Sequence, residues 1–266
     1  MRKLLALTAA LAVAAAIVGS ALANHSWGSY HWSRTANPFT LTVSDNVDLN
    51  KWDPYLNYAI SDWSTSTVLD LVKVDGGASP SSCTPTAGRI EACSYAYGNT
   101  GWLGIAQIWV SGGHITQATT KVNDSYFDTP TYNTPAWRRL VMCQEIAHDF
   151  GLDHQDENFN NENLGSCMDY TNDPDGVEGG ASSTDPSNER PNGHDYDQLV
   201  TIYGGHVDGS GGGSTCPGKG KKRCSSANAD APPFAHASRA NGSVYVDHLP
   251  NGGRLLTHVF WTPFGE

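Results

Sequence analysis

The stretch of sequence that decides the fold runs from Gln144 to His154 and reads QEIAHDFGLDH. In a helix, Gln144 and His148 lie on one face because they are four residues apart. Gly151 then allows the chain to turn sharply, since glycine readily adopts a positive φ. His154 follows three residues later and can return towards the same face. The stretch therefore predicts three ligand-capable side chains around one ion, with the Glu145 carboxylate beside them.

This stretch resembles the zinc signature of the metzincin metallopeptidases, H-E-x-x-H-x-x-G-x-x-H. Four positions match the signature: Glu145, His148, Gly151 and His154. Gln144 stands where the first histidine ligand is expected. The resemblance covers residues 39–206 and is strongest to secreted matrixin-like and snapalysin-like members.

The segment SCMDY, residues 166–170, is similar to the Met-turn of that family. In the family a methionine lies beneath the metal, and a tyrosine often follows two residues later. The resemblance therefore implies that Met168 underlies the metal. It also implies that Tyr170 stabilises the oxyanion of the reaction if its hydroxyl reaches it.

Gln144 leaves three interpretations open. In the first, the site works with a Gln-His-His ligand set, because the Gln144 carbonyl oxygen has a reach similar to that of a histidine nitrogen. This oxygen is a harder and weaker donor to Zn²⁺ than imidazole, so the affinity for zinc should fall. Alternatively, the fold has lost efficient metal binding. In the third interpretation another histidine supplies the missing ligand, and the candidates are His25, His31, His114 and His194.

The resemblance implies a secreted zinc-dependent metalloendopeptidase. Zn²⁺ would activate a water molecule and polarise the scissile carbonyl, and Glu145 would act as general base. We expect the polypeptide substrate to lie extended along an edge strand at residues 115–122, using its unpaired backbone groups. The alternative function is a catalytically weak or inactive protein of the same fold that binds an extracellular polypeptide or glycan.

Hydrophobic periodicity predicts an α+β fold. The resemblance further implies a zincin-like domain with a mixed, mainly five-stranded twisted sheet, an active-site helix and a Met-turn, and the helical spacing places that helix over 136–150. Thr134 is the predicted N-cap of that helix, with Pro135 at its first position. The other expected elements are strands at 39–43, 68–74, 103–110 and 115–122, helices near 52–63 and 195–203, and a small C-terminal hairpin at 243–262.

The first residues predict the compartment. A positive start, the apolar run 4–18 and the small residues Ala21 and Ala23 are typical of a secretory signal peptide. The run is short for a membrane anchor, so we expect a secreted protein. The expected boundaries are a signal peptide at 1–23, an N-terminal arm at 24–38, the metzincin-like catalytic domain at 39–206, a linker with a cysteine-bracketed basic loop at 207–226 and the hairpin segment at 227–266.

Six cysteines in an oxidising compartment favour disulfides. Cys83 with Cys93 and Cys216 with Cys224 are the natural local partners. The family's Met-turn lies beneath its helix, so the resemblance implies a bond between Cys143 and Cys167. Fifteen pairings are compatible with six cysteines.

Composition excludes one class of partner and leaves one cofactor open. The 266 residues include 27 acidic and 16 basic side chains, and the formal charge of −11 argues against a nucleic-acid-binding protein. We expect a monomer with no membrane contact. Oxygen ligands suitable for Ca²⁺ occur among the loop acids Asp153, Asp156, Asp173, Asp175 and Glu178, without EF-hand spacing.

Overall fold

The computed structural model describes residues 25–177, 185–208 and 242–263. This part of the chain is mixed α+β, as expected. The helices are α1 (Asp53–Trp63), α2 (Asp124–Phe127), α3 (Pro135–His148) and α4 (Gly193–Tyr203). The strands are β1 (His31–Trp32), β2 (Phe39–Asn46), β3 (Leu69–Asp75), β4 (Arg89–Tyr95), β5 (Trp102–Ser111), β6 (His114–Asn123), β7 (Val244–His248) and β8 (Arg254–Trp261).

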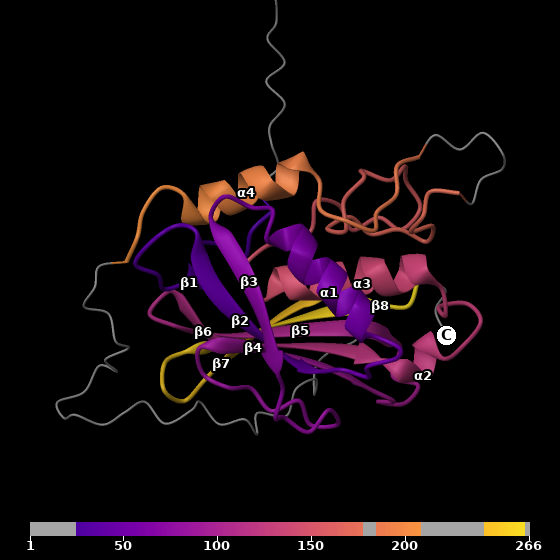
Figure 1. Ribbon diagram of the computed structural model, residues 1–266, viewed down its shortest axis with the longest axis horizontal. Helices are drawn as coiled ribbons and strands as arrows, with labels where there is room; N and C mark the ends of the chain where they lie inside the picture. The colour runs from indigo at the N-terminus through magenta and orange to yellow at the C-terminus, as the bar shows by residue number, and fades with distance from the viewer. Residues whose placement is uncertain (1–24, 178–184, 209–241, 264–266) are drawn as a thin grey trace, which may run out of the picture.

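All eight described strands belong to one sheet, and α1 and α3 lie along one of its faces (Figure 1). The strand order is β3-β2-β4-β6-β5-β8-β7, and the short β1 pairs in parallel with β6. The strands β2, β3, β4 and β6 run parallel, whereas β5 is antiparallel to β6. The expectation of five strands is therefore wrong for the sheet as a whole.

Strand β4 is not among the predicted strands, because the pair Cys83 and Cys93 favours a loop between them. Residues Ile90 to Ser94 are buried, and β4 pairs with β2 on one side and β6 on the other. The Cys83–Cys93 disulfide is present and ties the preceding loop to this strand. Alternation is absent here because both faces of a central strand are covered.

Strand β6 is not the edge strand that was predicted at residues 115–122. It pairs with β4 and with β5, and every residue from Ala118 to Asn123 is buried. The consecutive polar residues Thr119, Thr120 and Lys121 are buried and covered by other parts of the fold. An extended peptide therefore cannot add to β6.

The C-terminal hairpin is not a separate extension. Strand β8 pairs antiparallel with β5 over nearly its whole length, from Trp102 opposite Trp261 to Val110 opposite Arg254. Strand β7 then forms one end of the sheet. Figure 1 shows this yellow hairpin continuing the sheet beside β5. The outer edge of β5 is thus occupied by the chain's own C-terminal segment.

Helix α3 begins where the sequence predicts, but it ends at His148, two residues before the predicted end at Phe150. The Thr134 side chain caps it by accepting a hydrogen bond from the Trp137 N–H, and Pro135 is the first helical residue. Twelve of its fourteen residues are buried, because the helix lies between α1 and the sheet. Gly151 has a φ of 98°, and a side chain there would meet the Tyr30 carbonyl oxygen at 2.5 Å. Only glycine suits this turn.

The N-terminal arm packs against the end of α3. The Trp27 N–H donates to the carbonyl of Gly151, and the Trp32 indole N–H donates to that of Asp149. Both tryptophans are buried. Among the described helices, none is long and apolar enough to cross a membrane. The predicted signal peptide and the predicted Cys216–Cys224 bond lie outside the described residues.

Candidate metal centre

Helix α3 and the turn after it bring His148 and His154 together, as the sequence predicts. The two Nε2 atoms are 3.1 Å apart. Nδ1 of His148 donates to the Leu152 carbonyl at 2.8 Å, and Nδ1 of His154 donates to the Glu157 carboxylate at 2.8 Å. These contacts fix both tautomers, since a ring nitrogen that donates carries the proton.

The facing Nε2 atoms of His148 and His154 suit a cation. With both protons on Nδ1, each Nε2 carries a lone pair, and neither nitrogen can donate to the other. Burial lowers the pKa of both rings, and so favours their neutral, metal-binding form. Ligand atoms around a tetrahedral Zn²⁺ lie about 3.3 Å apart for the usual bond lengths. The hydrogen bonds of both Nδ1 atoms are also those that orient metal-ligating histidines.

His258 on β8 completes a group that the sequence analysis did not foresee. One ligand atom from each of His148, His154 and His258 lies within 4.8 Å of the others. The His258 ring centre is 3.9 Å from that of His148 and 4.4 Å from that of His154. None of the four histidines proposed from the sequence joins this group.

The two nitrogens of His258 are engaged differently from those of the other rings. Nδ1 lies 3.2 Å from a carboxylate oxygen of Glu145, and Nε2 lies 2.8 Å from the Tyr170 hydroxyl. Burial lowers the pKa of His258 to about 3, so the ring is neutral. His258 therefore contacts both residues that the sequence assigned to catalysis, and it must release one hydrogen bond to bind a metal.

Glu145 is fully buried between α3 and the sheet, where it contacts Gly104 on β5 and His258 on β8. Its Oε1 has no hydrogen-bond partner among the described residues, and Oε2 faces His258. Burial raises the pKa of this carboxyl well above its usual value, although His154 opposes the shift. Gly104 on β5 makes room for the carboxylate, because a Cβ there would lie 2.7 Å from the Glu145 Cγ and Oε1.

Gln144 lies one turn before His148 on α3, and its amide is oriented by the segment 166–170. Its Nε2 donates to the Cys167 carbonyl at 2.7 Å, and its Oε1 is buried without a hydrogen-bond partner among the described residues. The Cys143–Cys167 disulfide is present and joins the same two segments. Ligation by Gln144 stays a prediction, and the unpartnered oxygen is the feature it requires.

The other predicted residues are placed as follows. Met168 is fully buried in the turn, and Tyr170 is buried against His154 and His258. His25 contacts Asp195 and stacks on His194, and it is not a member of the group of His148, His154 and His258. Calcium stays a prediction. Asp153 belongs to a candidate metal-ligating group with His154 and Glu157, whereas among the described residues no such group includes Asp156, Asp173 or Asp175. Glu178 lies outside the described residues.

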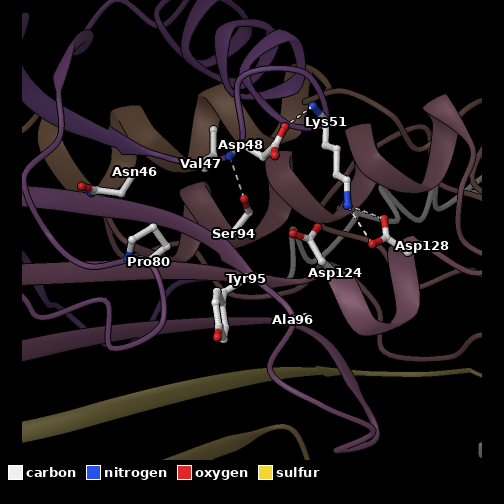
Figure 2. Close-up of a pocket in the computed structure, with 10 residues that line it drawn as sticks. All are labelled: Asn46, Val47, Asp48, Lys51, Pro80, Ser94, Tyr95, Ala96, Asp124 and Asp128. Carbon is white, nitrogen blue, oxygen red and sulfur yellow. Dashed lines mark hydrogen bonds and ion pairs between the residues drawn. The ribbon is translucent and has the colours of Figure 1, made fainter.

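A hollow of about 370 Å³ opens where β2 and β4 end and α2 begins (Figure 2). Its charged groups already have partners. Figure 2 shows the Lys51 ammonium on the Asp128 carboxylate and the Ser94 hydroxyl accepting the Asp48 N–H. Asp124 accepts the Trp52 indole N–H. The hollow contains none of the residues of the histidine group.

No protein-family model matches this chain, and no curated protein matches it. The chemistry of the histidine group is therefore the feature that bears on function.

Proposed function

We propose that this chain is a secreted zinc metalloendopeptidase that is held in a closed state by its own C-terminal hairpin. The observation that carries the proposal is the pair of opposed Nε2 atoms of His148 and His154 beside the buried carboxylate of Glu145. A pair of imidazole lone pairs with no donor between them is expected at a metal site.

The residues of the chain divide the reaction between them. His148 and His154 would hold Zn²⁺, with Gln144 or His258 as the third ligand. The ion would supply a Lewis acid for the scissile carbonyl and would activate water. Glu145 would take the proton of the attacking water and deliver it to the leaving amine. The Tyr170 hydroxyl would donate a hydrogen bond to the oxyanion once His258 releases it.

The described closed state leaves no room for a substrate. Glu145, His148 and His258 are fully buried, and β8 occupies the edge of β5, the strand directly below Glu145. An extended peptide that adds to a sheet needs an unpaired edge. Catalysis would therefore require the hairpin to leave β5, which removes His258 and frees the general base.

The hairpin is also attached to the site by a second contact. The Ser243 hydroxyl donates to Oε1 of Glu157 at 2.9 Å, the same oxygen that accepts from His154. The hydrogen bond from His154 holds the pKa of Glu157 at about 2, so this carboxylate is charged at neutral pH. The hairpin thus contacts the site at two points: Ser243 binds Glu157, and His258 faces Glu145.

The pairing of the hairpin with β5 also favours a second function, that of a binding module. A chain whose hairpin never leaves β5 would be an inactive protein of this fold that acts as a binding module. The two functions differ in what happens when His258 is removed. We therefore choose His258→Ala as the test, with His248→Ala as the control, because His248 lies on the same hairpin and is exposed.

The measurements are bound zinc by elemental analysis and casein hydrolysis with and without a chelator. We expect the unaltered protein and His248→Ala to bind zinc and to hydrolyse casein slowly. His258→Ala should retain zinc and hydrolyse casein at least tenfold faster. Absence of zinc from the unaltered protein would overturn the proposal. A zinc-loaded His258→Ala variant without hydrolysis would favour the binding module, and loss of zinc would make His258 the third ligand.

A further inference from the structure

A second group of imidazole and carboxylate side chains lies where three distant segments of the chain meet. His31 on β1 is the register partner of His114 at the start of β6. His206 and Asp208 follow the end of α4. One ligand atom from each of His31, His206 and Asp208 lies within 4.8 Å of the others.

The ligand atoms of this group face one another at metal-binding spacing. Nε2 of His31 is 3.3 Å from Nε2 of His206 and 3.7 Å from Oδ1 of Asp208. Nε2 of His114 is 3.1 Å from the same Oδ1. These distances are close to the roughly 3.3 Å between ligands of a tetrahedral Zn²⁺.

Neighbouring groups orient two of these ligands. Nδ1 of His31 donates to the Ser29 carbonyl at 2.7 Å, so its Nε2 carries the lone pair. The Arg34 N–H donates to Oδ2 of Asp208 at 2.9 Å, and the Arg34 guanidinium lies 3.5 Å from that oxygen. Oδ1 is therefore the carboxylate oxygen that faces the imidazoles. The rings of His31 and His206 meet edge to face, and their Nε2 atoms face each other.

We propose that His31, His206 and Asp208, with His114 as the fourth ligand, form a second metal site that binds a divalent transition-metal ion such as Zn²⁺. Imidazole nitrogens with one carboxylate oxygen are ligands suited to this class of ion. This site is separate from the group of His148, His154 and His258, because the two groups share no residue. The ion would hold the N-terminal arm, the start of β6 and the end of α4 together.

The test uses the full-length chain with the substitutions His148→Ala and His154→Ala, which remove the proposed catalytic ligands. Elemental analysis after zinc loading and dialysis should give about one equivalent of zinc in this background. The unaltered protein should contain about two. Adding zinc at a hundredfold excess over Kd should raise the Tm of the background variant by roughly 5–10 °C.

Further substitution of His206 by alanine identifies the site. His206 is exposed and lies beyond α4, so this variant is expected to fold. It should lose the remaining equivalent of zinc and the rise in Tm, and His114→Ala should weaken zinc binding at least tenfold. His248→Ala, an exposed histidine outside both groups, should change neither quantity.

Two results would overturn the second site. One is a background variant that binds no zinc and shows no rise in Tm, which would make the group a hydrogen-bonded network only. The other is a His206→Ala variant that keeps the zinc equivalent. Both readouts are independent of peptidase activity, so failure of the proposed catalytic function leaves this test intact.

Discussion

Nδ1 of His258 lies 3.2 Å from Oε2 of Glu145, although 113 positions separate the two residues in the chain. The contact exists because β8 pairs with β5, the strand on which Glu145 rests through Gly104. A histidine from the C-terminus thus faces the carboxylate that the helix motif marks as general base. The closed state of the proposed site follows from this one strand pairing.

Substitution of Glu145 by glutamine should separate catalysis from metal binding. We expect Glu145→Gln to abolish casein hydrolysis in the His258→Ala background while zinc stays bound, since the amide cannot accept the proton of water. Activity and zinc content are measured on the same preparation. A variant that kept full activity would show that Glu145 is not the base.

Substitution of Gln144 by histidine tests the third ligand. We expect Gln144→His to tighten zinc binding at least tenfold, because imidazole is a better donor to Zn²⁺ than an amide oxygen. Competition with a chromophoric chelator measures the affinity. Unchanged affinity would indicate that Gln144 is not a ligand and that its amide serves only the hydrogen bond to Cys167.

The space above Gly104 should be needed for the position of Glu145. A Cβ in Gly104→Ala would lie 2.7 Å from the Glu145 Oε1 and 2.8 Å from a Val141 methyl, so the helix or the carboxylate must shift. We expect a loss of about 1–3 kcal/mol in the free energy of unfolding and at least a tenfold loss of activity in the His258→Ala background. Gly193→Ala is the control, because a Cβ there meets open space. Equal behaviour of the two variants would contradict the prediction.

Lys121 should destabilise the protein in a pH-dependent way. Burial lowers the pKa of its ammonium from 10.5 to about 8. Because the unfolded chain binds more protons between these values, stability should rise with pH from about 8 to 10.5, and the penalty should be complete below pH 8. We therefore expect Lys121→Met to raise the free energy of unfolding at pH 7 by about 1–3 kcal/mol.

Urea unfolding at pH 7 and pH 9.5 measures the effect of Lys121→Met. The gain should be smaller at pH 9.5, since the native lysine is then largely neutral. A gain that is equal at both pH values would point to packing alone, and a loss of stability would show that the ammonium has a favourable role.

The Cys143–Cys167 bond should stabilise both the fold and the proposed site. It joins α3 to the turn that carries Met168, with a sequence separation of 24. Its removal by paired alanine substitutions should cost about 3 kcal/mol of unfolding free energy and should weaken zinc binding. The Cys83–Cys93 bond closes a shorter loop, with a sequence separation of 10. Its removal should therefore cost slightly less unfolding free energy and leave zinc affinity unchanged. Equal zinc affinities in the two variants would contradict the role at the site.

The sequence predicts those parts of the site whose residues lie close together along the chain. Helix periodicity, the Thr134 cap and the Gly151 turn were sufficient to bring His148 and His154 together. Strand β6 differs from the prediction because its many polar residues are normally typical of a strand with one solvated face. Here both faces are covered, and polar side chains such as Thr120 find partners inside, in this case the Asp149 carboxylate.

The sequence by itself determined helix α3, the turn after it and the existence of a C-terminal hairpin. It favoured Cys83–Cys93 as a local pairing, whereas the Cys143–Cys167 bond was implied only by the family resemblance, and the structure contains both. Only the tertiary structure decided where that hairpin lies and that His258 faces Glu145. Local periodicity reports which face of a strand is buried, but it carries no information on the partner strand. Strand β8 lies roughly 150 residues after β5, and their pairing depends on the free edge that the finished sheet presents. The same reason applies to His31, His114 and His206, which become neighbours only when the arm, the sheet and the end of α4 assemble.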